Sequence, residues 1–427
     1  MKRLWEITLA ACALLALVAL PAALAACGGS GAILSSSPNP TPAFTSAAPA
    51  AAITATAGGA HAAMFRADLE RTGVFPPGGP TGLPKLLWSF DARWGDYTEY
   101  VSDPVVSGGV AYFGGQDSHL YAVDIGSGQE LWRFKAGDWV RCPAISRGVV
   151  YVGSHDGRVY ALRAKSGREL WRFLTGATIW SSPAVSKGIV YIGSEDGYLY
   201  ALSSRSGHER WKFHTAGTVG SSPAVSNGVV YVGSHDAHLY ALNARSGRLQ
   251  WAFKASGPVT TEAAVVGGAV CFGTWDNLGT PAAGDPSGHH LYAVDVHSGL
   301  EKWLFDTHGV VTSPAVAGGV AYVGSDDGRL YAVDVRTGKE KWSFYAGRGY
   351  FGVQSSPVLS GGVVYFGSGA PNRSLYALDA ASGRELWAFP AGAAIDSSPA
   401  IANGVIYFTG VVDNSGSGGC GRLFALK

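Results

Sequence analysis

The 427-residue chain has few charged residues and almost no excess of one sign. Charged residues make up 15% of the sequence, with 32 Lys and Arg against 31 Asp and Glu, so the formal net charge is only +1. Proteins whose main role is to bind nucleic acid usually carry a strong basic excess, because phosphate contacts supply much of the affinity. We therefore expect no nucleic acid among the partners.

Cysteine is also scarce, and its distribution argues against a disulfide scaffold. Of the five cysteines, Cys12 and Cys27 lie in the N-terminal segment, whereas Cys142, Cys271 and Cys420 are scattered over the rest of the chain. An odd number in unrelated positions predicts no disulfide framework, although one pair stays open. The sequence also lacks a Cys-x-x-Cys-His segment for attaching haem.

The N-terminal 27 residues have the pattern of a targeting segment. Lys2 and Arg3 precede an apolar stretch over residues 7–20. The sequence LAAC at 24–27 resembles a bacterial lipobox, so we expect a lipoprotein signal peptide and acylation of Cys27. An ordinary secretory signal cleaved after residue 25 and an uncleaved membrane anchor stay open as alternatives. Pro21 argues against the anchor, because proline interrupts a helix.

Two irregular segments follow the targeting segment. Residues 28–60 are rich in Ala, Ser, Thr, Pro and Gly and nearly uncharged, which predicts a disordered tether. By flexible-chain scaling such a tether has a mean span of ~30 Å. Residues 61–87 resemble a lead-in to the folded domain, which we place at 61–427. Within the lead-in, residues 64–69 are expected to form a short helix or an extended plug, in a structural role against the rim.

The rest of the chain is built from one repeated unit, best seen at 181–213. The apolar runs 189–192 and 198–202 read as strands joined by an Asp-Gly turn. A Ser-Gly turn leads to a third strand at 211–213, and the segment SSPAV at 181–185 supplies a fourth, innermost strand. The Trp of the outermost strand recurs at Trp88, Trp132, Trp171, Trp211, Trp251, Trp303, Trp342 and Trp387.

A four-stranded unit that repeats about every 40 residues is typical of a β-propeller blade. The first Trp strand, at Trp88, precedes any complete unit, and the last unit ends the chain without such a strand. We therefore predict an all-β fold with eight four-stranded blades, closed by pairing of the N-terminal and C-terminal strands. Closure removes the open sheet edges of a linear array.

The repeat resembles the PQQ-like β-propeller family. The shared pattern is G-V-V-Y-V-G-S-x-D-G-x-L-Y-A-L-D-A-x-S-G-x-E-x-W-x-F, assembled from several repeats over residues 64–427. This family includes quinoprotein dehydrogenases and BamB, a lipoprotein of the outer-membrane barrel-assembly machinery, so the resemblance fixes the fold more firmly than the function. The adjacent Cys-Cys pair of many quinoprotein alcohol dehydrogenases is absent.

One candidate site lies where the innermost strands depart from their repeated Ser-Ser-Pro. Carboxylates, one arginine and two tryptophans near one axis could hold a polar ligand or a flat ring, whereas the alternative is a water-filled channel with incidental polar residues. The departures, which are candidate cofactor-binding positions, are Asp103, Trp139, Arg141, Trp180, Glu262, Gln354 and Asp396. Under the resemblance, five of them are the only raw material for a quinone, a Ca²⁺ site and an Asp base: Glu262, Trp139, Trp180, Asp103 and Asp396.

A second candidate site is one face of the propeller. Because strands alternate in direction, the loops between second and third strands share a face with the connections between blades; we call it the loop face, and the opposite one the turn face. The longer segments at 91–100, 274–290, 345–354, 368–374 and 409–422 all belong to the loop face. Its aromatic residues are candidate binding anchors: Trp94, Tyr97, Tyr100, Trp275, Tyr345, Tyr350 and Phe351.

The His-Asp tips of two hairpins do not predict a metal site. His155 and His235 occupy equivalent tips two blades apart, so we expect them to be solvated and well separated, and we expect no metal. The favoured hypothesis is a monomeric, lipid-anchored, extracytoplasmic propeller that binds a protein or another envelope component without catalysis or cofactor. A PQQ-dependent dehydrogenase with Ca²⁺ and a propeller that binds a small ligand or glycan are the alternatives.

Overall fold

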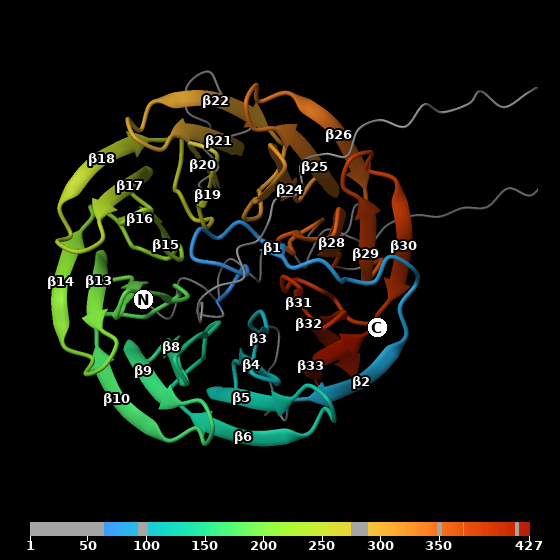
Figure 1. The fold of residues 1–427 in the computed structure, drawn as a ribbon, viewed down its shortest axis with the longest axis horizontal. Helices are drawn as coiled ribbons and strands as arrows, with labels where there is room; N and C mark the ends of the chain where they lie inside the picture. Colours follow the sequence, from blue (N-terminus) through green and yellow to red (C-terminus); the bar gives the residue numbers. More distant parts are fainter. Residues whose placement is uncertain (1–63, 93–100, 275–288, 348–351, 370, 415–417) are drawn as a thin grey trace, which may run out of the picture. The chain divides into compact units, whose positions relative to one another are not determined.

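The computed structural model describes residues 64–92, 101–274, 289–347, 352–369, 371–414 and 418–427, with the backbone only at 413, 414, 418 and 419. Its regular structure consists entirely of strands, arranged as eight sheets in a ring (Figure 1). Among these residues, no helix is long and apolar enough to span a membrane. The predicted all-β propeller with eight four-stranded blades is confirmed.

The blades follow one another along the chain, each running from the central channel outwards. Blade 1 contains β3 (Val105–Ser107), β4 (Val110–Gly114), β5 (His119–Asp124) and β6 (Glu130–Lys135). Blade 2 contains β7 (Ala144–Ser146), β8 (Val149–Gly153), β9 (Arg158–Arg163) and β10 (Glu169–Leu174). Blade 3 contains β11 (Ala184–Ser186), β12 (Ile189–Gly193), β13 (Tyr198–Ser203) and β14 (Glu209–His214). Blade 4 contains β15 (Ala224–Ser226), β16 (Val229–Gly233), β17 (His238–Asn243) and β18 (Leu249–Lys254).

The second half of the ring repeats this order. Blade 5 contains β19 (Ala264–Val266), β20 (Ala269–Gly273), β21 (His290–Asp295) and β22 (Glu301–Asp306). Blade 6 contains β23 (Ala315–Ala317), β24 (Val320–Gly324), β25 (Arg329–Asp334) and β26 (Glu340–Tyr345). Blade 7 contains β27 (Val358–Ser360), β28 (Val363–Gly367), β29 (Ser374–Asp379) and β30 (Glu385–Pro390), and blade 8 contains β31 (Ala400–Ala402), β32 (Val405–Asn414), β33 (Gly418–Leu426) and β2 (Leu86–Asp91).

The two middle strands of each blade form the core because both of their faces are covered by neighbouring blades. In blade 3, every residue of β12 is buried, as are five of the six residues of β13. Such strands read as continuous apolar runs rather than as an alternation. The innermost strand is shorter than predicted: β11 starts at Ala184, after Pro183, because proline lacks the N–H that a ladder hydrogen bond requires.

The ring closes as predicted, by pairing of the two ends of the fold. Strand β2 lies antiparallel to β33, with Trp88 opposite Ala425 and Phe90 opposite Leu423. The Trp88 indole then donates a hydrogen bond to the carbonyl oxygen of Ile125 in blade 1, over 3.1 Å. The same bond recurs between other neighbouring blades, for example from Trp171 in blade 2 to Ser204 in blade 3 over 3.0 Å. Closure therefore uses the same tryptophan hydrogen bond that joins other neighbouring blades.

Residues 64–76 form a plug inside the channel, so the extended plug is confirmed and the alternative of a short helix is wrong. The expected packing against the rim is also wrong for this part. The plug crosses the inner strands at the turn face: the backbone N–H of Val225, Val265 and Val316 donates to the carbonyl oxygens of Leu69, Glu70 and Thr72. Its last residues form β1 (Val74–Phe75), which pairs in parallel with β27. Figure 1 shows this segment at the centre of the ring.

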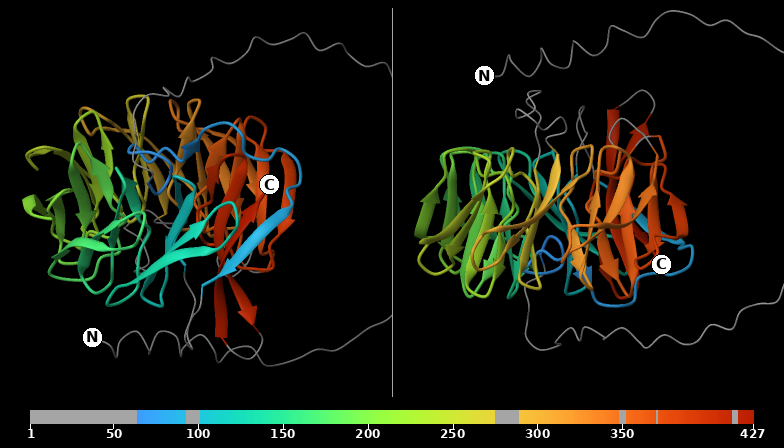
Figure 2. Two further views of the ribbon diagram at one scale, coloured as in Figure 1. Left: turned by 60° about the horizontal axis from the view of Figure 1, so that its bottom comes forward. Right: turned by 90° about the horizontal axis from the view of Figure 1, so that it is seen from above.

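The two faces of the ring differ in the length of their connections and in how far these project. On the turn face, short turns join β11 to β12 and β13 to β14 in blade 3, with counterparts in the other blades. On the loop face, β32 and β33 pair as far as Asn414 and Gly418. Residues 409–422, predicted as a loop, are thus largely an extension of this hairpin, which projects beyond the other blades in the right-hand view of Figure 2.

Candidate functional site

The residue just before the innermost strand, which precedes a proline in every blade except blade 5, belongs to a ring that lines the channel. Hydrogen bonds link several of these residues across neighbouring blades. The Ser222 hydroxyl donates to Glu262 Oε1 over 2.9 Å and accepts from the backbone N–H of Ser182 over 2.9 Å. On the far side of Glu262, the Ser313 hydroxyl contacts Oε2. Across the channel, Asp103 Oδ1 accepts from the backbone N–H of Ser398. Two predicted candidates, Asp103 and Glu262, therefore link neighbouring blades.

Two arginines of the plug close the turn-face end of this ring. Arg71 is completely buried, and its guanidinium donates to the carbonyl oxygens of Phe65, Ser182, Pro183 and Pro223 over 2.6–3.3 Å. Arg66 donates to the carbonyl oxygens of Ser313 and Pro314 over 2.8 and 2.6 Å. These oxygens would otherwise be buried without partners, which is unfavourable. The two arginines thus tie blades 3, 4 and 6 to one segment.

The carboxylates of the ring balance the charge of the plug. Burial lowers the pKa of Arg66 to about 10, whereas the nearby Glu262 and Asp103 act in the opposite direction. Burial also raises the pKa of Asp103 to about 6, against the hydrogen bond from Ser398. The arginines stay charged at neutral pH, and Asp103 and Glu262 supply counter-charge at the bottom of the channel. Both acidic candidates therefore have a structural role.

Cys142 takes the corresponding position of blade 2 in the ring. Its thiol is buried, and burial raises its pKa well above the usual range. Cys142, Cys271 and Cys420 are all free among the described residues. A buried thiol with a raised pKa is a poor nucleophile, because the thiolate is the reactive form.

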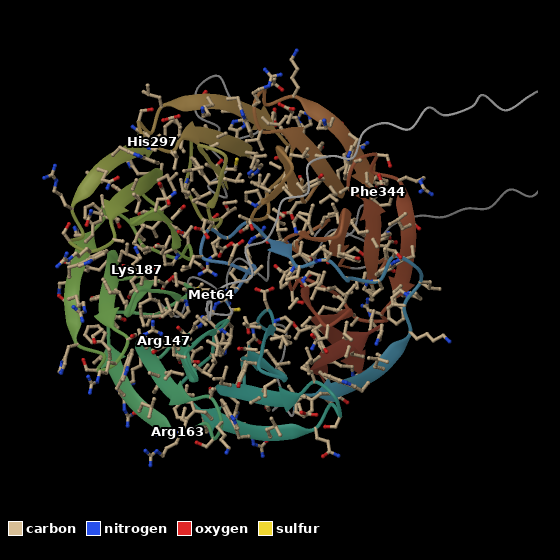
Figure 3. The ribbon with its side chains drawn as sticks, in the orientation of Figure 1. Met64, Arg147, Arg163, Lys187, His297 and Phe344 are labelled. Atoms are coloured by element: carbon tan, nitrogen blue, oxygen red, sulfur yellow. The ribbon has the colours of Figure 1, made fainter. Side chains whose placement is uncertain are left out.

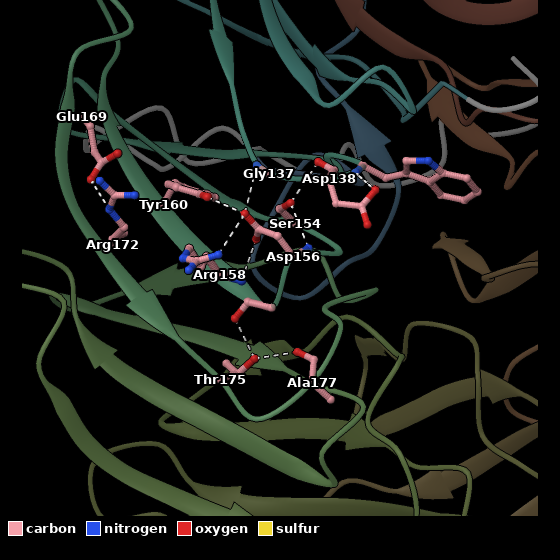
Figure 4. A network of polar contacts seen from close by, with 12 residues as sticks. Gly137, Asp138, Ser154, Asp156, Arg158, Tyr160, Glu169, Arg172, Thr175 and Ala177 are labelled. Atoms are coloured by element: carbon pink, nitrogen blue, oxygen red, sulfur yellow. Dashed lines mark hydrogen bonds and ion pairs between the residues drawn. The ribbon is translucent and has the colours of Figure 1, made fainter. Parts of the chain in front are cut away.

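At the loop face, hairpin tips of sequence Ser-x-Asp in blades 2, 3, 4 and 6, and Gly-x-Asp in blade 1, combine a structural aspartate with a variable residue before it. In blade 2, Asp156 Oδ2 accepts the Tyr160 hydroxyl over 2.5 Å and the Gly137 N–H over 2.9 Å, as Figure 4 shows. The bond from Tyr to Asp recurs in blades 1, 3, 4 and 6. The preceding residue varies, and its backbone N–H bonds the connection between blades in four of them, for example from His155 to Trp139. The variable residues are Gln116, His155, Glu195, His235 and Asp326.

His155 joins two of the predicted candidates in an aromatic cluster at the channel mouth. Its ring centroid lies 4.9 Å from that of Trp139 and 4.3 Å from that of Trp180, and the two indoles are 6.4 Å apart. The Arg141 guanidinium lies 5.1 Å from the centroid of Trp180 and donates to its carbonyl oxygen over 3.0 Å. The prediction of a solvated tip is wrong for His155: Nε2 is buried without a hydrogen-bond partner, and desolvation lowers the pKa of the ring to about 4.

Acidic and amide groups occupy the opposite side of the mouth. Gln354 Nε2 lies 3.5 Å from Asp326 Oδ1, and both line a cavity of about 330 Å³ together with Glu262. Burial raises the pKa of Asp326 to about 6, and Asp396 acts in the same direction. Asp396 itself has a raised pKa because of burial, and its Oδ1 has no hydrogen-bond partner. The mouth is therefore aromatic and cationic over blades 2 and 3, and acidic over blades 6 to 8.

The structure separates the predicted channel residues into two levels. Asp103 and Glu262 lie in the ring beside the plug, whereas Trp139, Trp180 and Gln354 lie at the mouth. Sequence reasoning missed the plug arginines and the role of His155; the variable position of Ser-x-Asp was the available indication for His155. Of the predicted aromatic anchors, Tyr345 is 52% exposed at the end of β26, with Arg329 5.5 Å from its ring centroid. The others lie outside the described residues, as does Cys27: Trp94, Tyr97, Tyr100, Trp275, Tyr350 and Phe351.

The residues of the channel do not fit a Ca²⁺–quinone pair. Both carboxylate oxygens of Glu262 accept serine hydroxyls, and Asp103 faces the plug. Ca²⁺ needs six to eight oxygen ligands around one point, but no group of three His, Cys, Asp or Glu residues converges within the described ranges. These carboxylates are already used by the ring and the plug.

Three solved structures share the fold. BamB from Moraxella catarrhalis aligns with a TM-score of 0.63 at 17% identity, covering 80% of this chain and 98% of that one. Quinohemoprotein alcohol dehydrogenase from Comamonas testosteroni aligns with a TM-score of 0.65 at 18% identity, covering 85% and 80%. The computationally designed protein Ika8 aligns with a TM-score of 0.64 at 16% identity, covering 78% and 98%. At these identities the likeness concerns the fold alone.

The family comparison covers most of the chain. A search of the curated proteins found no match to this chain. The family model described as "Outer membrane protein assembly factor BamB" matches residues 84–181, 155–278, 279–373 and 345–421, which together include every blade. The chain therefore belongs to this family of PQQ-like β-propellers.

Proposed function

We propose that this protein is a lipid-anchored, extracytoplasmic propeller that binds a protein or another envelope component through its loop face. Cys27 carries the lipid, residues 28–60 form the tether, and the propeller presents its channel mouth to the partner. The family description and the BamB structure support this proposal, since BamB is named as an assembly factor for outer-membrane proteins.

The observation that carries the proposal is the variation at the tips of the loop-face hairpins. These tips keep the aspartate that holds the hairpin. The residue before it varies: Gln116, His155, Glu195, His235 and Asp326. The fold needs the aspartate but does not require any particular residue at the position before it. Sequence that departs from the demands of the fold is where function is expected.

A second candidate function is the binding of a small ligand at the aromatic cluster. Trp139, Trp180 and His155 present ring surfaces beside the Arg141 guanidinium. Rings and a cation fit a planar or sugar-like ligand with an anionic group, because arginine pairs with anions while aromatic faces stack. The dehydrogenase alternative has weaker support, since the channel carboxylates do not fit its metal.

Two measurements test the proposal. Fractionation of cells should find the protein with membranes, and Cys27→Ser should release it; an unmodified mature N-terminus at another position would contradict the anchor. A photo-crosslinking residue is then placed at His235 or Asp326 of the loop face, and at Lys165 or Arg336 of the turn face. Adducts should form from the loop face, and adducts from the turn face alone would overturn the proposal.

A further inference from the structure

Three adjacent blades have turn-face turns that contain cations and no acidic residue. The turn after the third strand has the sequence RAKSGR at 163–168 in blade 2, SSRSGH at 203–208 in blade 3 and NARSGR at 243–248 in blade 4. None of these turns contains an acidic residue, and their Arg and Lys side chains are exposed. Figure 3, which looks onto this face, shows Arg163 and its neighbours Arg147 and Lys187.

These turns depart from the ones that the fold uses elsewhere. In blades 1, 5, 6 and 7 the first turn residue is an aspartate, and in blade 1 Asp124 Oδ1 accepts from the backbone N–H and hydroxyl of Ser127 over 2.8 and 2.7 Å. Blades 2, 3 and 4 replace this aspartate with Arg163, Ser203 and Asn243. The negative charge is therefore missing from the same three blades that carry the added cations.

The inner turns of blades 2 and 3 also carry a cation, although their backbone conformation disfavours a long side chain. Arg147 and Lys187 have φ values of 50° and 46°, in the left-handed region that is unfavourable for residues with a long side chain. Blades 1, 5, 6 and 7 have glycine at this position, as at Gly108 with φ of 58°. Two independent kinds of turn thus place cations where the fold favours aspartate or glycine.

A groove between blades 3 and 4 opens on the same patch. It has a volume of about 670 Å³ and is lined by Lys187, Arg210 and Arg245, with the amide side chains of Asn227 and Asn243. One acidic residue, Glu70 of the plug, also lines it. Three cations and two amides suit a phosphate group, because both kinds of side chain donate hydrogen bonds to its oxygens.

The start of the described chain lies on the same side of the ring. Met64 packs with the core of blades 2 and 3, and the 63 residues before it are outside the description. The plug that it begins crosses the inner strands at the turn face. A flat cationic face beside the point where a long N-terminal segment joins the fold suits a surface rather than a compact ligand.

We propose that the turn face of blades 2 to 4 lies against a bilayer of anionic phospholipids. The cations hold this face on the membrane, the groove receives a phosphate head group, and the loop face points away from the lipid. The inference goes beyond the proposed function, because the contact involves a different face and adds to the attachment by the acyl chain on Cys27.

The test compares the partition of the full chain into two kinds of vesicle, phosphatidylcholine alone and phosphatidylcholine mixed with phosphatidylglycerol. The N-terminal segment contributes to partition into both kinds of vesicle. The ratio of the two partition coefficients therefore reports on the cationic face. The ratio should exceed one and fall with added salt, because counter-ions screen the attraction. Equal partition into both kinds of vesicle would overturn the proposal.

A matched pair of variants assigns the effect to the patch. The first, Arg147→Gly with Lys187→Gly and Arg163→Asp, introduces the residues that other blades carry, so its thermal stability should not fall. The control, Arg336→Asp with Lys339→Asp, removes the same charge from the turn face of blade 6. One unit of charge near an anionic membrane contributes about fivefold to affinity. The first variant changes four units of charge, so it should lower the ratio by on the order of 600-fold, and the control should lower it by much less. Equal losses from both variants would overturn the proposal.

Discussion

At the scale of single residues, the channel is organised by buried charge. Arg71 and Arg66 carry positive charge into the interior and satisfy carbonyl oxygens of three blades. Glu262 and Asp103 supply the opposite charge. Their positions were predictable as departures from Ser-Ser-Pro, but their role was not. The lead-in was expected to form a short helix or an extended plug, but the sequence did not indicate that its arginines would bind the inner strands.

The first prediction concerns Arg71. Replacing it with methionine keeps most of the side-chain volume but leaves four buried carbonyl acceptors without a donor. We expect the free energy of unfolding to fall by about 3 kcal/mol, measured by urea denaturation. The exposed Arg205 of blade 3 is the control, because its replacement by methionine should change stability by less than about 0.5 kcal/mol. Equal losses would contradict the role given to the plug.

The second prediction concerns Asp103 and pH. Its pKa in the folded protein is about 6, above the unfolded value of about 4. The folded state therefore binds this proton more tightly, and the resulting stabilisation is complete below about pH 4 and is lost as the pH rises to about 6. Asp103→Asn should flatten the dependence of stability on pH in this window and raise stability at about pH 7 by up to about 2 kcal/mol.

Asp124 on the turn face is a suitable control, because its pKa is shifted in the opposite direction to that of Asp103. Hydrogen bonds from Ser127 lower the pKa of Asp124, so its contribution is present above the unfolded pKa and is lost as the pH falls through the folded one. Asp124→Asn should therefore lower stability at neutral pH. Between about pH 4 and 6, the change of stability with pH should remain nearly as in the parent. A stability curve for Asp103→Asn that parallels the parent would contradict the assignment.

At the scale of elements, the blade was predictable, whereas the plug was only one of two alternatives for its segment and its path was not predictable. Strands repeat with the same apolar runs and turn residues, so eight copies confirm one another, and the Trp strand before the first blade indicates closure. The plug has no repeat, and Arg66, Ala67 and Arg71 adopt φ values of 57–71° that sequence patterns do not predict. The inner strand begins late because Pro183 cannot join the ladder.

The third prediction concerns the contact between blades. Gly207 has φ of 73°, and a Cβ atom there would lie 2.6 Å from the ring of Trp171 in the preceding blade. Gly207→Ala should therefore combine backbone strain with displacement of the indole, lowering stability by about 2–3 kcal/mol. Gly188 has φ of 80° and ample space for a Cβ atom, so Gly188→Ala measures the strain alone, about 1 kcal/mol. Equal effects in thermal unfolding would show that the Trp–Gly contact contributes little.

At the scale of the whole ring, stability depends on closure by β2. The pairing of β2 with β33 completes blade 8, and its loss would expose a strand edge and the apolar face under Trp88. Closure followed from counting Trp strands, whereas the difference between the faces was only partly predictable. The longer loop-face segments were visible in the sequence, but the cationic turns became apparent only once neighbouring blades could be compared in space.

The fourth prediction concerns this closure. A chain lacking residues through Phe90 should aggregate or melt at a much lower temperature, because β33 becomes an open edge. A chain lacking residues 1–63 keeps both the plug and β2, and should melt like the parent. If the longer deletion also melted like the parent in calorimetry, the ring would have to close in another way.

The measurement that tests the account most directly compares the affinity of a crosslinked and identified partner for variants of the two faces. Tyr345→Ala on the loop face should weaken binding by more than about 1 kcal/mol, as expected for an aromatic anchor, and His235→Ala should act in the same direction. Lys165→Glu, Arg205→Glu, Arg245→Glu and Arg336→Glu on the turn face should leave the affinity for this partner unchanged. Loss confined to the turn-face variants would show that the partner binds the opposite side of the propeller.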